Sequence, residues 1–166
     1  MKQSQNYAKK VWKNPGYFIA FGFGSGLLPI APGTFGTLAA IPLYYFLSFN
    51  APITYLLITL ACLVAGIWIT DYVSKDMRIH DFGGIVWDEI VGFFITMFLV
   101  PCTLTTIIVG FFLFRIFDIW KPWPISVIDK SLGGGLGIML DDVLAAIYAS
   151  VVIHCLGYFG LFQIIM

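Results

Sequence analysis

Charge is scarce in this sequence. Asp, Glu, Lys and Arg together make up 11% of the 166 residues, whereas soluble domains carry about 25%. Apolar residues account for 60% of the chain, and the mean hydropathy is +0.93. A soluble fold of this length has no means of burying so much apolar surface, so we expect most of the surface to face lipid.

Cysteine and histidine are scarce as well. Cys62, Cys102 and Cys155 stand singly in apolar runs without a CxxC pair, so no convincing zinc cage is present and we interpret the cysteines as small packing residues. The formal net charge is zero, which gives no indication of nucleic acid or another strongly charged partner.

Three long stretches lack Asp, Glu, Lys and Arg altogether, namely residues 14–70, 90–114 and 143–166. Such stretches are membrane candidates. Within them we predict apolar helices, some of them shorter than a perpendicular span needs, at residues 37–49, 53–70, 90–100, 104–119 and 143–163. The expected fold is all-α: a single domain of residues 1–166 forming a small polytopic membrane bundle of three to five spanning or re-entrant helices.

Two short proline-containing connections, residues 50–52 and 101–103, join neighbouring apolar segments as predicted helical hairpins. Both charged regions and the N-terminal arm then lie on one side of the membrane. This basic arm, residues 1–14, carries four lysines. By the positive-inside rule we expect the N-terminus and the polar site to be cytoplasmic, at the inner (cytoplasmic) membrane of a cell.

All nine acidic residues lie in two charged regions, 71–89 and 115–142. Asp88 and Glu89 stand at the mouth of an apolar run. Because successive helical residues are about 100° apart, we expect one of them to face a polar site and the other to pack against a loop. Complementing the helix dipole is the alternative role. His80 and Asp81, just before, are candidates for a general acid or base.

The second charged region begins with Arg115, Asp118 and Lys121, which recur every three residues and therefore share one helix face. An arginine among Phe114, Ile119 and other apolar residues needs an anionic partner, either from the protein or from a ligand. Phosphate is a suitable ligand for such a cation.

A glycine-rich stretch, residues 133–137, precedes Asp141 and Asp142. We predict a loop there, either a flexible turn or a phosphate-binding one, leading into a helix that carries both acids near its start. Five carboxylates then gather at the cytoplasmic ends of three helices, and hard oxygen ligands of this kind favour Mg²⁺. The predicted metal ligands are Asp88, Glu89, Asp118, Asp141 and Asp142.

The uncharged segment 21–37 is dense in glycine, serine, threonine and proline. Its backbone must be irregular, and irregular backbone at membrane depth is tolerated where it lines a protein cavity. We therefore expect this segment to form a wall of the site, with Ser25, Thr34 and Thr37 donating hydrogen bonds to substrate oxygens.

Four stretches in this order resemble the signature motifs of the phosphatidylglycerophosphatase A family: FGSGLLPIAPGTFGT, IHDFGGIVWDEIVG, FRIFDIWKPWPI and GGGLGIMLDD. The resemblance covers about residues 21–149. It implies a bacterial membrane enzyme that converts phosphatidylglycerophosphate to phosphatidylglycerol and requires Mg²⁺. By motif position it assigns the site to Asp88 and Glu89, to Arg115, Asp118 and Lys121, and to Asp141 and Asp142.

The mechanism we expect has carboxylates holding Mg²⁺ against the terminal phosphate, Arg115 and Lys121 neutralising its charge, and a metal-activated water attacking phosphorus in line. A phosphorylated aspartate is a second route. Two other functions fit less well: a CDP-alcohol phosphatidyltransferase, whose DxxDG pattern is absent, and a small transporter, which would carry charges inside its spans. The sequence does not indicate an oligomeric state.

Overall fold

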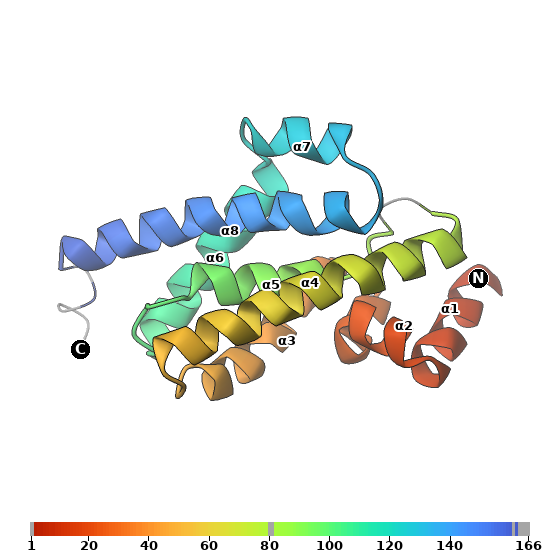
Figure 1. The fold of residues 1–166 in the computed structure, drawn as a ribbon, viewed down its shortest axis with the longest axis horizontal. Helices are drawn as coiled ribbons and strands as arrows, with labels where there is room; N and C mark the ends of the chain where they lie inside the picture. The colour runs from red at the N-terminus through yellow and green to blue at the C-terminus, as the bar shows by residue number, and fades with distance from the viewer. Residues whose placement is uncertain (1, 80–81, 161, 163–166) are drawn as a thin grey trace.

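The computed structural model describes residues 2–79, 82–160 and 162, and within these ranges all regular structure is helical (Figure 1). The predicted all-α fold is confirmed. The helices are α1 (Lys2–Lys13), α2 (Pro15–Ala20), the 3₁₀ helix η1 (Gly22–Leu27), α3 (Pro32–Leu47), α4 (Pro52–Met77), α5 (Trp87–Thr96), α6 (Leu104–Trp120), α7 (Ile125–Ser131) and α8 (Gly134–Tyr158).

Two of the described helices, α4 with 26 residues and α8 with 25, are long and apolar enough to cross a membrane. The helices α3, α5 and α6 have 16, 10 and 17 residues and are shorter than a full perpendicular span. Large apolar side chains remain exposed on the outside of the bundle, for example Trp68 at 77%, Phe112 at 58% and Val151 at 59%. This surface suits a lipid environment and indicates a membrane-associated protein.

The helix α5 lies at the centre of the bundle and packs against α3, α4 and α8. Its residues Ile90, Val91 and Phe93 are fully buried. Two tyrosines of other helices bind the C-terminal end of α5 and the turn after it. The Tyr55 hydroxyl donates to the Phe94 carbonyl of α5 at 2.7 Å, and the Tyr44 hydroxyl donates to the carbonyl of Val100, just after α5, at 3.3 Å. Burial and these hydrogen bonds together hold α5 in place within the bundle.

The prediction of a glycine-rich loop before Asp141 and Asp142 is wrong. Residues from Gly134 onward already belong to α8, so this helix begins nine residues earlier than the predicted 143. Close packing explains the glycines, because a Cβ on Gly135 would lie 2.0 Å from the Ile67 carbonyl oxygen of α4. Asp141 and Asp142 consequently lie about two turns inside α8.

Segment 21–37 is only partly irregular. Gly22, Phe23, Gly24 and Ala31 have positive φ, but α3 starts at Pro32, a residue that favours the first turn of a helix. Two further differences concern elements that the sequence analysis did not predict. The basic arm forms a helix, α1, and a short helix, α7, connects α6 to α8.

Candidate metal and phosphate site

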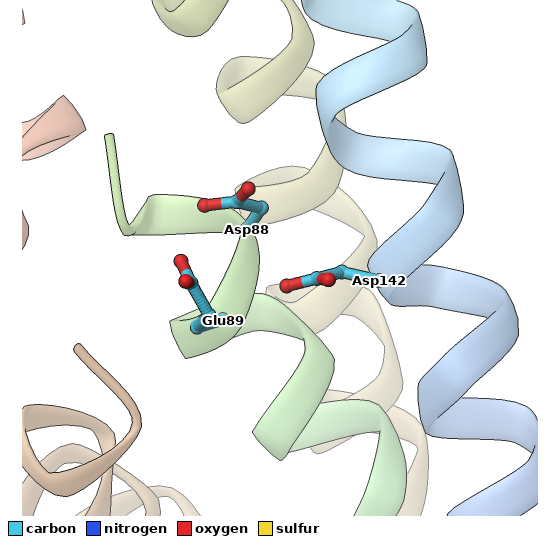
Figure 2. A group of neighbouring side chains, drawn as sticks. All are labelled: Asp88, Glu89 and Asp142. Carbon is cyan, nitrogen blue, oxygen red and sulfur yellow. The ribbon is translucent and has the colours of Figure 1, made fainter. Parts of the chain in front are cut away.

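Three carboxylates from two helices converge. Asp88 and Glu89 project from the first turn of α5, and Asp142 projects from α8 toward them (Figure 2). One ligand oxygen from each residue lies within 4.8 Å of the other two. The chain thus brings together acids that are more than fifty positions apart in the sequence.

The expectation that Asp88 and Glu89 point to different surroundings is wrong. Both carboxylates reach the same cluster. Side chains in a helix tilt toward its N-terminus, and in the first turn no preceding turn stands in the way. The extra methylene of Glu89 compensates for the rotation between adjacent residues. The dipole at the N-terminus of α5 also favours negative charge here.

The cluster is poorly solvated. Asp142 is 3% exposed, and the side chain of Glu89 is 12% exposed. Burial, and then the neighbouring Glu89 charge, raise the pKa of Asp88 well above its usual range. Burial also raises the pKa of Glu89 to about 7, although its contacts with Asp88 and Arg115 act in the opposite direction. These carboxylates therefore need a compensating cation to be fully ionised.

Arg115 lies between two acids. One of its terminal nitrogens is 2.5 Å from Asp118 Oδ2 and 3.6 Å from Glu89 Oε1. The side chains of Arg115 and Asp118 are each only 13% exposed. The prediction that this arginine has an anionic partner is confirmed, and the guanidinium joins α6 to the carboxylate cluster.

Lys121 and Asp141 form a second ion pair, with 2.6 Å between Nζ and Oδ2. Lys121 ends α6 in a left-handed conformation, φ 44°, so it leaves the helix face shared by Arg115 and Asp118. The adjacent acids of α8 therefore have different surroundings. Asp142 enters the carboxylate cluster, and Asp141 holds a cation beside it.

Gly33 is a residue of the site that the sequence motifs did not indicate. A Cβ at this position in the first turn of α3 would lie 2.1 Å from Glu89 Oε1 and 3.1 Å from both terminal nitrogens of Arg115. The bare backbone of α3 therefore covers the contact between Glu89 and Arg115. The predicted helix began only at residue 37, but the PGT sequence of residues 32–34 was the available signal, because proline favours the first turn of a helix and glycine permits a close approach.

Two of the three predicted hydroxyl donors form hydrogen bonds within the protein. The Ser25 hydroxyl donates to the Gly22 carbonyl at 2.8 Å, and the Thr37 hydroxyl donates to the Gly33 carbonyl at 3.0 Å. Thr34 lies next to Gly33 in the first turn of α3. A role for these three residues in substrate binding stays a prediction. His80 and Asp81 fall outside the described residues.

The carboxylate cluster fits a magnesium ion. Asp88 Oδ1, Glu89 Oε2 and Asp142 Oδ2 are buried and have no hydrogen-bond partner among the described residues. Such oxygens are costly to bury unless they coordinate something. Carboxylate oxygens, completed by oxygens of substrate phosphate and water, are the ligands that Mg²⁺ prefers.

Comparisons with known proteins identify the family of the chain. The sequence profile of the phosphatidylglycerophosphatase A family matches residues 18–157. Proteins named phosphatidylglycerophosphatase A from Escherichia coli and Haemophilus influenzae are 42% and 45% identical over 146 and 150 residues, which cover 87% and 89% of this chain and 85% and 92% of theirs.

A putative phosphatidylinositol-3-phosphatase from Bacteroides thetaiotaomicron is 41% identical over 143 residues, 81% of this chain and 89% of its own. No solved structure matches the chain. The profile match covers most of the sequence and includes every acid of the carboxylate cluster. The chain belongs to the phosphatidylglycerophosphatase A family.

Proposed function

We propose that this protein hydrolyses phosphatidylglycerophosphate to phosphatidylglycerol and inorganic phosphate, with Mg²⁺ as cofactor, as a step in phospholipid synthesis. The observation that carries the proposal is the buried cluster of Asp88, Glu89 and Asp142 beside Arg115. Three acids suit a cation, and the adjacent arginine suits a phosphate. The names of the relatives at 42% and 45% identity supply the substrate.

In this proposal Asp88, Glu89 and Asp142 hold the metal. A bound Mg²⁺ supplies positive charge that polarises the phosphoryl group and the attacking water. Arg115 has two terminal nitrogens at the edge of the cluster, and its guanidinium stabilises the charge that develops on the phosphoryl oxygens. Asp118 orients that guanidinium through the 2.5 Å contact. The oxygen of water bonds to phosphorus while the bond to the glycerol oxygen breaks.

Lys121 and Asp141 extend the polar surface on the side of α8. Lys121 orients the phosphate through its charge, and Asp141 holds the lysine in place. His80 and Asp81 are the proposed groups that exchange protons with the attacking water and the leaving alcohol. A phosphorylated aspartate is the second mechanism, and trapping of phosphate on the protein during turnover distinguishes the two.

We also propose that the protein lies in the bacterial inner membrane with its N-terminus and site facing the cytoplasm. The basic residues of α1 support this orientation. The relative named as a putative phosphatidylinositol-3-phosphatase supports lipid phosphate monoesters as the wider substrate class. The two substrates share the phosphate and differ in the alcohol.

The test is phosphate release by the detergent-solubilised protein given phosphatidylglycerophosphate, with Mg²⁺ or with a chelator. We expect release that stops with the chelator and returns with excess Mg²⁺. An Arg115→Gln variant is expected to lose most of this activity, and Lys75→Gln, which changes an exposed lysine at the end of α4, is the matched control. Absence of metal-dependent release would refute the assignment. Transfer of phosphatidyl groups to an alcohol would favour the phosphatidyltransferase alternative.

A further inference from the structure

One side of α1 fixes this helix to the rest of the protein. Lys10 Nζ lies 2.6 Å from Asp76 Oδ2 near the end of α4. The same carboxylate oxygen accepts a hydrogen bond from the Tyr17 hydroxyl at 2.6 Å. Val11, next to Lys10, is fully buried. The helix is therefore held against the Met77 end of α4, beside α2 (Figure 1).

The opposite side of α1 has no such partner among the described residues. Lys9 and Lys13 are exposed, and between them Trp12 is 67% exposed. Positions 9, 12 and 13 follow helical spacing, so these side chains share one face. An exposed tryptophan between two lysines is typical of a helix that lies in the membrane interface.

This face continues into a row of aromatic rings. The centroids of Trp12 and Phe18 are 5.7 Å apart, those of Phe18 and Phe23 are 5.5 Å apart, and those of Phe23 and Trp87 are 6.1 Å apart. Trp87 directly precedes Asp88 of the carboxylate cluster. Phe23 itself is 41% exposed. The row thus joins the basic helix to the start of α5.

The row also runs along the direction in which α4 crosses the membrane. Near its basic end, Lys10 binds Asp76. At its other end, the Trp87 indole donates to the Cys62 carbonyl at 3.1 Å. Along α4 these two positions are about 21 Å apart. The lysines thus lie at one end of the row and Trp12, Phe18 and Phe23 follow them, and basic residues followed by aromatic ones are typical of a membrane interface.

We propose that the face formed by Lys9, Trp12, Lys13, Phe18 and Phe23, the arm face, binds anionic phospholipids at the bilayer surface. The lysines contact phosphate groups and Trp12 lies among the headgroups. A bilayer fits better than a soluble partner, because the exposed lysines are followed by the apolar rings of Trp12 and Phe23, which are 67% and 41% exposed. This inference rests on the proposed membrane location and is independent of catalysis.

The first experiment follows the depth of position 12 in reconstituted full-length protein. A Trp12→Cys variant, with the three native cysteines replaced by alanine, carries an environment-sensitive fluorophore, and a Lys75→Cys variant carries it as the control. Lipids bearing a quencher are included in vesicles of phosphatidylcholine, alone or mixed equally with phosphatidylglycerol. We expect quenching at position 12 to be several-fold stronger in the mixed vesicles and to weaken at high salt.

The second experiment uses the unmodified Trp12. Hydrogen exchange of α1 is expected to slow in the mixed vesicles for the wild type, and this slowing is expected to be lost in a Lys9→Gln/Lys13→Gln variant. Neither readout involves turnover, so each is separate from the test of the phosphatase activity. Equal quenching in both vesicles, quenching no stronger than at position 75, or slowing that survives removal of the lysines would overturn the proposal.

Discussion

The acids of the site have separate partners. The sequence predicts five candidate metal ligands, but Asp118 pairs with Arg115 and Asp141 pairs with Lys121, which leaves Asp88, Glu89 and Asp142 in the cluster. Residue types and motif order predicted that these side chains belong to one site. The division among them depends on where each helix begins and how it is rotated, and sequence spacing alone does not fix either.

Gly33 gives the sharpest prediction for a single residue. Gly33→Ala is expected to reduce turnover by about 100-fold, because its Cβ would displace the Glu89 carboxylate. Gly33→Ala/Glu89→Asp is expected to recover part of the loss, since shortening the acid by one methylene makes room for the methyl group. The measurement is kcat and the Mg²⁺ concentration for half-activation, with thermal unfolding as a check of folding. A double variant no better than the worse single one would contradict the account.

Removal of metal is expected to make stability depend on pH. Glu89 has its pKa raised from 4.5 to about 7 in the folded protein. Between these values the folded protein keeps a proton that the unfolded chain has released, so the free energy of unfolding falls as pH rises. Mg²⁺ binds the deprotonated form and counters this fall.

Thermal unfolding in detergent with chelator is therefore expected at a lower temperature at about pH 8 than at about pH 5, and added Mg²⁺ should recover the difference. Glu89→Gln, which cannot ionise, should show a smaller change. An unfolding temperature that rises over this range without metal would show that the buried acid does not behave as inferred.

Among the helices, α6 agrees with its prediction within one residue, 104–119 against Leu104–Trp120. Proline in the preceding turn and the Thr103 cap define its start locally. The start of α8 was not predictable in this way. Taken from the sequence alone, its glycines predict a loop. In the structure they are helical, because α4 packs directly against them. Tertiary contact overrides local propensity there.

Three glycine-to-alanine variants test this packing. Gly135→Ala is expected to lower the free energy of unfolding by about 1–3 kcal/mol, because the new methyl group meets the Ile67 backbone at 2.0 Å. Gly110→Ala should cost less, since it meets the movable sulfur of Met97 at 2.3 Å. Gly83→Ala, with nothing within 4 Å, is the control. The measurement is thermal or denaturant unfolding in detergent, and equal effects at all three sites would count against tight packing of α4 and α8.

On the scale of the whole molecule, the sequence predicted that two distant charged regions meet at one end of a bundle. The structure confirms that residues 88–89, 115–118 and 141–142 lie together. The alternation of charged and uncharged stretches predicts this outcome, because two hairpins would return the chain to the same side. The number of full spans does not follow from the sequence alone, because helix length depends on caps and packing.

The proposed sidedness of the membrane protein can be tested with cysteines at its two ends. The native Cys102 is exposed in the turn between α5 and α6, at the end of the bundle opposite to Lys75. In inside-out membrane vesicles we expect an impermeant thiol reagent to label Lys75→Cys but not Cys102, each as the single cysteine of its variant. Right-side-out vesicles should give the reverse. Labelling of both positions from one side would refute the proposed orientation.

The central claim is that Asp88, Glu89 and Asp142 hold a divalent cation. The most direct measurement is Mn²⁺ binding to the solubilised full-length protein by electron paramagnetic resonance, with Mg²⁺ as competitor. We predict saturable binding that Mg²⁺ displaces, weakened by about 100-fold or more in Asp142→Asn and much less in Asp141→Asn. Binding that is unchanged in Asp142→Asn, or weakened equally in both variants, would contradict the account.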